Sequence, residues 1–476
     1  KNSTTGISDI YHEEFVQCFQ KLGFSYDVYT KTSSDEHKSF VQEFHKRLYE
    51  SQYVYEKETP QAYCENCDTF LADRFVLGKC PKCGKDTRGD QCDFCGTVLE
   101  PENLIEPVCA ICKKAIGFRK SRHLYIAITK LQSELRDMVI RHPEWRKNAI
   151  AFTNRYIEEG LRDRALTRDL EWGIKVPKDG YENKTIYIWA ENVLGYLSAS
   201  KIAAEERGSD FDALWGKDAK HYYVHGKDNI PFHTIILPAL LLANGKTKHL
   251  PDRIISSEYL TLEGRKISTS QNYAIWVKDL LDNYEADSIR YFFLANGPEK
   301  KDADFSWREY VNSHNGELLG AYGNFINRSL VFIAKYYDGI VPQGKNNPVL
   351  NKQIEELFGT VGKQIEDGTF RDALDTIFGF IRNANKFFDT EQPWITRTTD
   401  AAACENTLYQ CVQIIANLAV LLYPFLPFSS AKVCNWLNIN SKWEKHSVSA
   451  GYILPKIEVL FQRIDKKVIE METEKL

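Results

Sequence analysis

Four Cys-x-x-Cys pairs lie within 49 residues of this chain and constrain its fold more than any other feature. A gap of two residues lets both thiolates of a pair bind one metal ion, and two pairs complete a tetrahedral shell. Because four thiolates leave no open coordination position, the pairs predict two structural zinc ions rather than a catalytic one. The pairs are Cys64 and Cys67, Cys80 and Cys83, Cys92 and Cys95, and Cys109 and Cys112.

Other features of the cysteines also favour metal binding. Gly84 and Gly96 directly follow the second and third pairs, where a zinc knuckle must turn sharply. The alternative is a set of disulfides. The remaining four cysteines are scattered along the chain, and this arrangement favours reduced thiols on metal.

The composition is that of an ordinary globular protein. The 476 residues are 43% hydrophobic and 26% charged, and this length suggests about two to four domains. With 61 Lys plus Arg against 65 Asp plus Glu, the net charge of −4 excludes a generally polybasic surface but not a local basic track. No apolar run reaches the length of a membrane span, so we expect a cytoplasmic protein.

The N-terminal half predicts a mixture of helices and short strands. Apolar spacing predicts a helix over 8–22, a short strand at Tyr26–Tyr29 and a second helix that opens at Ser34. A cysteine-rich insertion follows at about 56–121, and 128–160 is predicted helical with a break near Pro143. Further on, short β-branched or aromatic runs alternate with helices, which predicts a doubly wound parallel sheet. These runs are Thr185–Trp189, His221–His225 and Arg253–Tyr259, and an apolar helix is expected over Phe232–Leu242.

The chain from about residue 307 to its end has no strand pattern. Its apolar periodicity predicts an all-helical domain of the bundle type. The expected helices cover 307–337, 348–366, 370–390, 401–422, 427–437 and 463–474.

The sequence His225-Gly226-Lys227-Asp228 ends a predicted strand and opens a helix. Gly226 would let a ligand approach the backbone, and Asp228 would accept hydrogen bonds from ribose hydroxyls. The same residue types are also usual in an ordinary turn, which taken alone is the simpler interpretation.

A hydroxyl-rich loop at Gly264–Ser270 carries the adjacent cations Arg265 and Lys266. Such a loop can close over a triphosphate and neutralise charge on a leaving pyrophosphate. Taken alone, a solvated basic loop is the better interpretation of these residues.

Two groups of aromatic and polar residues are further candidates for binding sites. Trp189 and Tyr196 flank a turn at Gly195 and could wall an apolar pocket, although core packing is an equal alternative. Asn324 and Arg328 share a helix face, and Trp394 follows a proline. An amide, a guanidinium and an indole suit unpaired bases, whereas a buried tryptophan beside a solvated face is the plainer interpretation.

Taken in this order, the motifs resemble the methionyl-tRNA synthetase family of class I aminoacyl-tRNA synthetases, over essentially the whole chain. The cysteine pairs look like its connective domain with four knuckles and two zinc ions. The other matching segments are Arg164–Gly173, where the chain re-enters the catalytic domain; Gly226-Lys227-Asp228 and Phe232-His233, for nucleotide and methionine; Lys266–Ser270, similar to the Lys-Met-Ser-Lys-Ser signature; and Asn324, Arg328 and Gln392-Pro393-Trp394, for the anticodon.

The resemblance implies an α/β fold with a Rossmann-type doubly wound parallel sheet that is incomplete at its N-terminus. A zinc-knuckle insertion and a C-terminal α-helical anticodon-binding bundle complete the expected fold. The implied domains are 1–52 (first Rossmann half), 53–166 (connective domain), 167–260 (second Rossmann half), 261–306 (signature loop and stem contact) and 307–476 (anticodon binding). The implied zinc pairing is nested, with Cys80, Cys83, Cys92 and Cys95 on one ion and Cys64, Cys67, Cys109 and Cys112 on the other; loop closure also favours the inner set.

The resemblance also assigns site residues and partners. The implied substrates are methionine, ATP with Mg²⁺ and tRNA(Met), both initiator and elongator, and we expect a monomer. The implied site residues are Lys266, Ser268, Ser270 and Arg168 for catalysis; Gly226, Lys227, Asp228, Lys266 and Thr269 for ATP; Trp189, Tyr196, Phe232 and His233 for methionine; and Asn324, Arg328 and Trp394 for the anticodon.

Three features depart from the family pattern. The His-Ile-Gly-His signature and the acidic residue that holds the substrate amino group lie upstream of these motifs in the family. Since neither occurs in the 476 residues, we expect a truncation of about 60–70 residues, the size of one strand–helix half-unit. Thr269 replaces the second signature lysine, and Glu191-Asn192-Val193 stands where the family has Asp-Ala-Pro or Asp-Ala-Leu.

The expected function is therefore methionine–tRNA ligation. Two alternatives stay open at this point. One is a class I synthetase for leucine, isoleucine, valine or cysteine, and the other is a tRNA-binding relative without catalytic activity.

Overall fold

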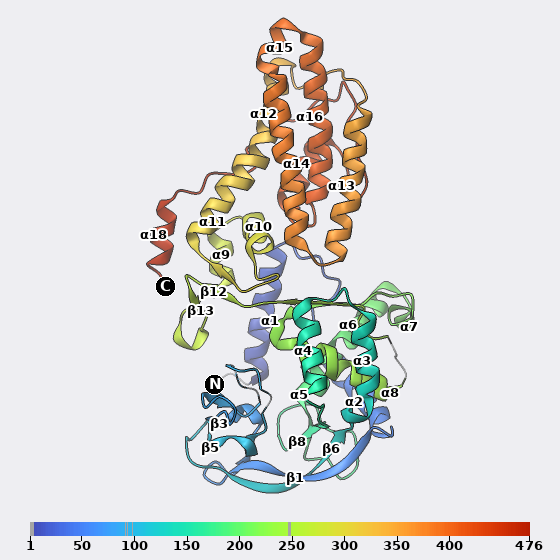
Figure 1. Cartoon of the computed structure of the whole chain (residues 1–476), viewed down its shortest axis with the longest axis vertical. Coiled ribbons are helices and arrows are strands. Elements are labelled where there is room, and N and C mark those ends of the chain that lie inside the picture. Colours follow the sequence, from blue (N-terminus) through green and yellow to red (C-terminus); the bar gives the residue numbers. More distant parts are fainter. Residues whose placement is uncertain (1–3, 91, 93, 98, 246–248) are drawn as a thin grey trace. The chain divides into compact units, whose positions relative to one another are not determined.

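The computed structural model describes the chain except for residues 1–3, 91, 93, 98 and 246–248. Its contacts divide the chain into two compact units (Figure 1). One unit comprises Tyr26–Ser256, and the other combines Lys1–Ser25 with Ser257–Leu476. Each unit is described by itself below.

The first helix of the unit Tyr26–Ser256 is α2 (Asp35–Tyr49), which begins where the sequence predicted it. The Ser34 side chain accepts a hydrogen bond from the His37 amide, and acidic residues occupy the first turn, where the helix dipole favours negative charge. The strand predicted at Tyr26–Tyr29 is wrong, because this segment is irregular and pairs with none of the strands in the described residues.

A long antiparallel pair of strands carries the cysteine-rich insertion. β1 (Val54–Cys64) pairs with β6 (Gly117–Ile126) in the register Val54↔Ile126 to Tyr63↔Gly117. β2 (Thr69–Phe70) and β7 (Arg164–Ala165) extend this sheet in the order β2-β1-β6-β7. A second sheet, β4 (Asp86–Arg88), β3 (Val76–Lys79) and β5 (Ile105–Cys109), lies within the insertion and has a small apolar core of its own.

The remainder of this unit packs helices around short strands, which confirms a mixed α/β class. The helix α8 (Leu237–Asn244) is buried on nearly all sides and lies in the core. Two expected elements differ from their predictions: the strand at Thr185 is shorter and ends at Ile186, and the helix at Phe232 opens with a π-helical turn over Phe232–Ile236 and continues to Asn244. The strands are β8 (Thr167–Arg168) paired with β9 (Thr185–Ile186), and β10 (Tyr222–Gly226) beside β11 (Arg253–Ser257). The helices are α3 (Gln132–Arg141), α4 (Lys147–Glu158), α5 (Ile188–Glu191), α6 (Gly195–Arg207), α7 (Phe211–Leu214) and α8 (Leu237–Asn244).

The second unit joins the N-terminal helix to everything after residue 256. Its first part contains α1 (Thr4–Lys21), α9 (Val277–Asn283) and α10 (Ala286–Asn296). A small sheet runs in the order β13 (Arg265–Lys266), β12 (Leu260–Leu262) and β14 (Ala303–Phe305). A cluster of buried aromatic rings, including Phe292, Phe305, Trp307 and Tyr310, forms the core of this part.

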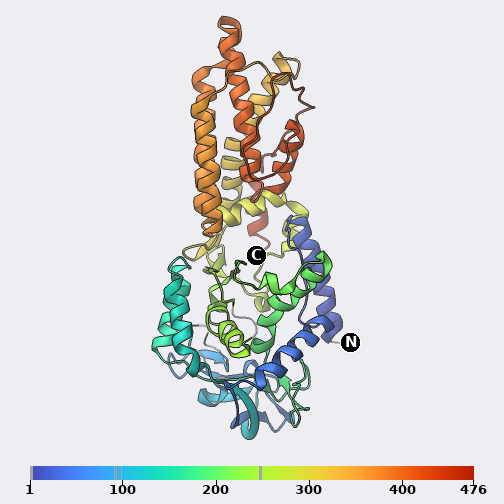
Figure 2. The ribbon, with the colours of Figure 1, turned by 90° about the vertical axis from the view of Figure 1, so that its right-hand side faces the viewer.

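The helical bundle predicted for the C-terminal part is confirmed. The helix α16 (Ala401–Leu422) is buried on most sides. Three other helices pack along it, namely α12 (Asn324–Tyr336), α13 (Pro348–Glu366) and α14 (Phe370–Glu391) (Figures 1 and 2). Residues 307–337 form three pieces, because a π-helical segment at His314–Gly323 interrupts the helix. Gln392 has a φ of 45° and Pro393 follows it, so α14 stops there and α15 is a separate helix. The helices are α11 (Trp307–Ser313), α12 (Asn324–Tyr336), α13 (Pro348–Glu366), α14 (Phe370–Glu391), α15 (Pro393–Thr399), α16 (Ala401–Leu422), α17 (Pro427–Leu437) and α18 (Lys467–Thr473).

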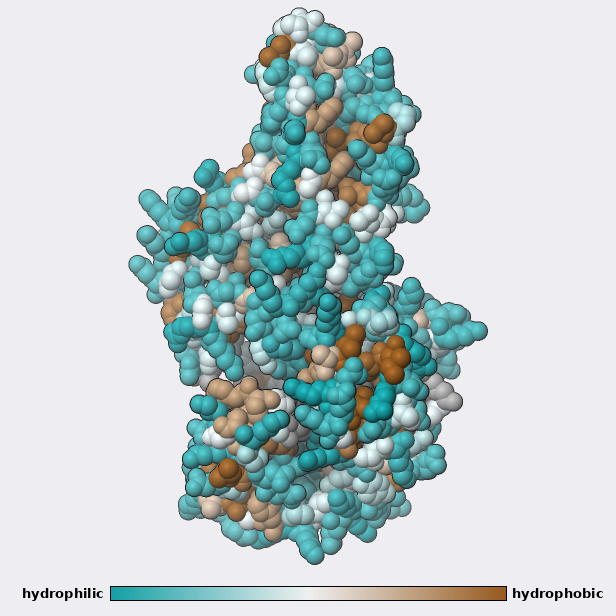
Figure 3. Space-filling view, in the orientation of Figure 1, coloured by the Kyte–Doolittle hydropathy of each residue, from teal (hydrophilic) through white to brown (hydrophobic). Residues whose placement is uncertain are grey.

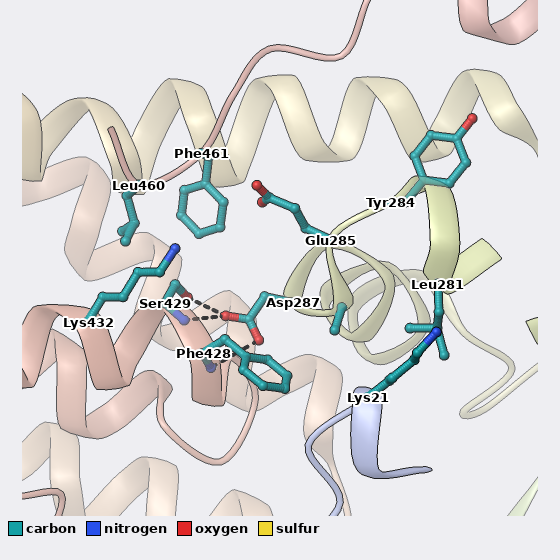
Figure 4. A pocket seen from close by; sticks show the side chains of 11 residues that line it. Lys21, Leu281, Tyr284, Glu285, Asp287, Phe428, Ser429, Lys432, Leu460 and Phe461 are labelled. Atoms are coloured by element: carbon teal, nitrogen blue, oxygen red, sulfur yellow. Dashed lines mark hydrogen bonds between the residues drawn. The ribbon is translucent and has the colours of Figure 1, made fainter. Parts of the chain in front are cut away.

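Polar contacts tie α10 to the bundle and to α1 within this unit. The Asp287 carboxylate accepts hydrogen bonds from the Ser429 amide at 2.6 Å and the Ser429 hydroxyl at 2.5 Å, in the first turn of α17 (Figure 4). Burial raises the pKa of Asp287, and these donors offset part of that rise. The Arg290 guanidinium donates to the carbonyls of Phe425 and Leu22. A cavity of about 410 Å³ lies beside this junction.

The surface is mostly polar on the face drawn in Figure 3, where hydrophobic residues gather only in a few small groups. Exposed large apolar side chains occur on several elements, among them α1 and the knuckle region. Among the described residues, no helix combines the length and apolarity that crossing a bilayer requires.

Candidate functional sites

The eight paired cysteines gather into two clusters of four thiols. Cys64, Cys67, Cys109 and Cys112 form one, and Cys80, Cys83, Cys92 and Cys95 form the other, with all Sγ atoms of a cluster within 4.8 Å of one another. The Sγ atoms of Cys64 and Cys112 lie 3.5 Å apart, and those of Cys80 and Cys95 lie 3.7 Å apart. A tetrahedron with Zn–S bonds of about 2.3 Å places its sulfurs roughly 3.8 Å apart. Both clusters therefore fit zinc, and they group in the nested order that the resemblance implied.

The backbone of each pair turns as a knuckle requires. The residue after the second cysteine has a left-handed φ in every case, at Asp68 (51°), Gly84 (71°), Gly96 (68°) and Lys113 (62°). The Gly84 amide donates to the Cys80 carbonyl at 2.8 Å, and the Gly96 amide donates likewise to Cys92 at 2.9 Å. The sharp turns predicted at the two glycines are confirmed. The turns at Asp68 and Lys113 were not predictable, because Asp and Lys are not diagnostic of this conformation.

Hydrogen bonds favour the thiolate form of some cysteines. The hydroxyl and amide of Thr97 lower the pKa of Cys95 to about 6, and the Lys114 amide lowers the pKa of Cys112 to about 7. The hydrogen bond with Cys112 raises the pKa of Cys67, whereas at Cys83 the Lys85 amide is outweighed by burial with the neighbouring thiols, which raises the pKa. The thiolate that binds metal is therefore favoured at Cys95 and Cys112 in particular.

The four residues assigned to methionine lie together in the unit Tyr26–Ser256. Trp189 of α5 stacks on Phe232, with ring centroids 3.6 Å apart and an interplanar angle of 11°. The Tyr196 hydroxyl of α6 lies 2.7 Å from Nε2 of His233. The structure thus brings these side chains together as two contacting pairs, whose members Phe232 and His233 are adjacent in the sequence.

The hydrogen bonds of His233 fix its tautomer. Nδ1 lies 2.8 Å from the Asn229 carbonyl, which can only accept, so Nδ1 carries the proton. Burial lowers the pKa of His233 to about 4, and the ring is neutral at physiological pH. Nε2 is therefore an acceptor, and the Tyr196 hydroxyl donates to it.

Two residues of β10 complete this site and were missed as site residues by the sequence analysis. His225 stacks on His233 with ring centroids 4.1 Å apart, and Tyr223 meets the Tyr196 ring edge-on at 5.0 Å. Tyr223 and His225 are two residues apart on a strand and so share one face. That alternation is the sequence signal that could have identified them.

The backbone at the end of β10 leaves room for a ligand. Gly226 is the last residue of the strand, and a Cβ built there meets nothing within 4 Å. A 3₁₀ turn at Lys227–Asn229 follows, and Asp228 is exposed. The predicted placement of this motif between a strand and a helix is confirmed.

The basic loop begins as a tight hairpin. Glu263 and Gly264 turn the chain with φ values of 45° and 74°, and the Gly264 amide donates to the Asp304 carboxylate at 2.8 Å. Lys266 pairs with Thr261 across the hairpin. Its side chain is exposed and forms no ion pair with any residue that the structure describes.

The rest of the loop folds back on the same hairpin. Ser268 exchanges both backbone hydrogen bonds with Tyr273 at 2.9 Å, and Thr269 opens a 3₁₀ turn. The Arg265 guanidinium lies 4.0 Å from the centre of the Tyr273 ring. The Ser270 side chain lies outside the described part of the chain.

Arg168 binds the knuckle region. Its guanidinium donates to the Asp73 carboxylate at 3.0 Å and lies 3.9 Å from the centre of the Tyr187 ring. Burial by itself lowers the pKa of this guanidinium, but the charge of Asp73 more than compensates and raises it. Arg164 makes a similar contact with Glu100 at 3.1 Å. The sequence analysis singled out neither acidic partner, because both are distant in sequence.

The three residues assigned to the anticodon also lie together. The Arg328 guanidinium of α12 lies 5.8 Å from the centre of the Trp394 ring of α15, and Asn324 is one turn away from it. Trp394 is 44% exposed, so the alternative of a buried tryptophan is wrong. α14 adds side chains that the sequence analysis missed, although their spacing by three and four residues marks one face. These are Asn385, Phe388 and Asp389, which contact Asn324 or Arg328.

Comparison with known families defines the class of this protein. A family described as "tRNA synthetases class I (M)" matches residues 2–330, and the "Anticodon binding domain of methionyl tRNA ligase" matches residues 341–475. The fold is also that of solved structures. The methionyl-tRNA synthetase of Mycobacterium tuberculosis in complex with methionyl-adenylate superimposes with a TM-score of 0.77 at 22% identity, over 95% of this chain and 86% of that one. The fold and the sites thus define a class I aminoacyl-tRNA synthetase.

Similar curated proteins identify the family within this class. Methionine–tRNA ligase 1 of Alkaliphilus oremlandii is 51% identical over 99% of this chain and 87% of its own length. Methionine–tRNA ligase of Bacillus cereus is 52% identical over the same shares of both chains. This chain belongs to the methionyl-tRNA synthetase family. The alternative of a synthetase for another amino acid is therefore wrong.

Proposed function

We propose that this methionine–tRNA ligase binds the methionine side chain against the stacked pair Trp189 and Phe232, beside the Tyr196–His233 hydrogen bond. The stacked pair next to a neutral histidine and a tyrosine hydroxyl is the observation that carries the proposal, because it combines apolar walls with one polar handle. A methionine carboxylate oxygen attacks the α-phosphate of ATP, the bond to pyrophosphate breaks, and methionyl-adenylate forms. A terminal adenosine hydroxyl of tRNA(Met) then attacks the activated carbonyl, and AMP leaves.

Recognition of methionine in this pocket rests mainly on shape and soft contacts. The thioether is a weak acceptor, but sulfur makes favourable contacts with aromatic rings. Because the Tyr196 proton is committed to His233, its oxygen offers lone pairs and not a donor to the ligand. Selectivity against an isosteric aliphatic side chain is therefore expected to be modest.

Catalysis consists of positioning and charge stabilisation, without a protein nucleophile. Gly226, Lys227 and Asp228 hold the adenosine, and Thr269 contributes to the ATP site. Lys266, with the hydroxyls of Ser268 and Ser270, stabilises charge on the leaving pyrophosphate. Mg²⁺ enters the site bound to ATP. The exposure of Lys266 without an ion pair to any described residue supports this role, whereas Arg168, held by Asp73, acts at most from the edge of the site.

The finer organisation is part of the same proposal. The domains are 1–52 and 167–260, whose two Rossmann halves form a doubly wound parallel sheet, 53–166, whose knuckles hold two zinc ions, 261–306, which carries the signature loop, and the helical anticodon-binding domain 307–476. It acts as a monomer in the cytoplasm on initiator and elongator tRNA(Met). Its anticodon surface comprises Asn324, Arg328 and Trp394, and their proximity on α12 and α15 supports that assignment.

Exchange of pyrophosphate into ATP, measured with each of the twenty amino acids on the full-length natural protein, tests the proposed activity. Exchange with methionine alone supports the proposal and shows that Thr269 and Glu191 are tolerated. No exchange in a folded, zinc-loaded sample would instead favour the tRNA-binding relative without catalytic activity.

Replacing Trp189 with alanine is expected to raise the KM for methionine about 10- to 100-fold, because the stacked wall of the pocket is lost. The KM for ATP should change little. Trp145→Phe is a suitable control, since Trp145 is a buried tryptophan of the same unit whose indole donates to the Asp252 carbonyl. An unchanged KM for methionine in Trp189→Ala would remove this residue from the pocket.

Replacing Trp394 with alanine is expected to lower kcat/KM for tRNA about 10- to 100-fold, since stacking on one base contributes roughly 1–3 kcal/mol. Methionine-dependent pyrophosphate exchange should stay unchanged, because that reaction does not involve tRNA. Trp443→Ala is the control, because Trp443 is another half-exposed tryptophan of the same unit. A parallel loss of exchange and charging would mean that Trp394 is structural.

A further inference from the structure

A buried histidine of α2 binds the segment that carries two of the proposed pocket residues. Nε2 of His37 lies 2.9 Å from the Glu191 carboxylate, and Nδ1 lies 2.8 Å from the Ser198 hydroxyl. The Ser198 hydroxyl also lies 3.2 Å from the Gly195 carbonyl. His37 is 1% exposed, Glu191 8% and Ser198 2%. These three polar groups thus satisfy one another away from water.

His45, two turns further along α2, binds the same segment at another point. Its Nε2 lies 2.9 Å from the carbonyl of Ala190, the residue after Trp189. Burial lowers the pKa of His45 to about 4, so the ring is neutral and Nε2 carries the donated proton. The Ala190 carbonyl therefore has a fixed partner on α2.

The segment between Trp189 and Ser198 needs such external support. It consists of the four-residue helix α5, a 3₁₀ turn at Asn192–Leu194 and the first turn of α6. Elements this short have few internal hydrogen bonds and marginal stability of their own. The contacts with α2 hold the segment at Ala190, Glu191 and Ser198, on either side of Tyr196.

Glu191 is also a position where this chain departs from the family pattern, which has aspartate there. The structure places its carboxylate on His37, and not among the rings that wall the pocket. The hydrogen-bonded row of serine, histidine and carboxylate resembles a hydrolytic triad. Ser198 is only 2% exposed, however, so no substrate reaches its hydroxyl. The arrangement therefore serves to hold the backbone.

We propose that His37 and His45 of α2, with Glu191 and Ser198, are positioning residues for methionine recognition. They set the distance between Trp189 and Tyr196, and thereby the width of the pocket. This inference rests on the proposed methionine pocket. Displacing a binding group by about 1 Å can lower the rate about 100-fold, so loss of these contacts should be visible in kinetics.

His37→Ala is expected to raise the KM for methionine about tenfold and to lower kcat no more than about threefold. The KM for ATP should stay within about twofold. Glu191→Ala should have a similar effect, and the double variant should be little worse than either single one, because both remove the same contact. Glu191→Gln keeps an acceptor of the same shape and should restore most of the methionine affinity.

His314→Ala is the matched control. His314 is 2% exposed and, like His37, uses both ring nitrogens, at 2.8 Å from the Ser288 hydroxyl and 2.7 Å from the Gln462 carbonyl. It belongs to the other unit. Its removal should lower Tm about as much as His37→Ala does, without changing the KM for methionine. An equal rise of that KM in both variants would overturn the inference, because it would then reflect general destabilisation.

Two further measurements keep the test decisive. If His37→Ala does not fold, Ser198→Ala removes only a hydroxyl, with its contacts to His37 and the Gly195 carbonyl, and should still raise the KM for methionine about two- to fivefold; an unchanged value overturns the inference. Trp189→Ala separates this inference from the proposed pocket. If Trp189→Ala raises the KM and the α2 variants do not, positioning by α2 is wrong and the pocket stands. If Trp189→Ala has no effect, the pocket itself is wrong.

Discussion

Replacing Lys266 with alanine lowers the rate of methionyl-adenylate formation about 100- to 1000-fold, the usual cost of removing one preorganised group that stabilises transition-state charge. The affinity for ATP is expected to change little, because the charge that we propose Lys266 neutralises develops mainly as the bond to pyrophosphate breaks. The exposed position of Lys266 in β13, directly after the Glu263-Gly264 turn, leaves its ammonium able to reach a ligand. Single-turnover formation of the adenylate, followed by quenched flow at saturating ATP and methionine, measures the effect.

Arg265→Ala is the matched control for this prediction. Arg265 is the adjacent cation, but its guanidinium packs against the Tyr273 ring, 4.0 Å from the ring centre. This contact holds the guanidinium on the protein and away from a ligand. Its loss should therefore lower the rate by less than about tenfold. Weaker ATP binding with an unchanged rate in Lys266→Ala would assign that lysine to ground-state binding. Equal effects of the two substitutions would assign the catalytic charge to the loop as a whole.

Removal of the two proposed zinc ions is expected to unfold the segment between β1 and β6. Structural zinc contributes about 10–16 kcal/mol to the folding of small zinc-binding peptides, and the apolar core of the knuckle region is small. Elemental analysis of the purified chain should give two zinc ions per molecule. A chelator should release both and make this segment susceptible to proteolysis, while the helical bundle remains protected.

Single cysteine substitutions separate the two clusters. Cys80→Ala should leave one zinc ion, and Cys64→Ala should leave the other, because each cluster draws its ligands from a different set of pairs. Cys411→Ala, at a buried cysteine in the bundle whose pKa burial raises to about 12, should retain both ions. A zinc content near one in the unmodified chain would refute the arrangement of two four-thiol clusters.

Much of the fold was predictable because it depends on local patterns. The helices of the bundle follow from apolar periodicity, and α2 begins at the residue whose side chain caps it. The interruption at His314–Gly323 was not predictable, since the apolar spacing of a π-helical segment differs too little from that of an α-helix. The predicted strand at Tyr26–Tyr29 failed because a strand forms only where another strand pairs with it.

The site residues divide in the same way. Motifs led to the residues proposed for the methionine pocket, the signature loop and the anticodon surface, and the structure brings the first and the last of these sets together. Their partners were not found. Asp73 binds Arg168 across 95 positions, and His37 binds Glu191 across 154, so no spacing in the sequence relates them.

By itself, the sequence determined the knuckle pairs, the helical C-terminal part and the order of the motifs, because spacing and periodicity act between near neighbours along the chain. Only the tertiary structure decided the tautomer of His233, the partner of Arg168 and the contacts of α2 with the segment after Trp189. Each of these depends on which side chains become buried together. Burial removes water as a partner, so the polar groups that meet in the interior must satisfy one another.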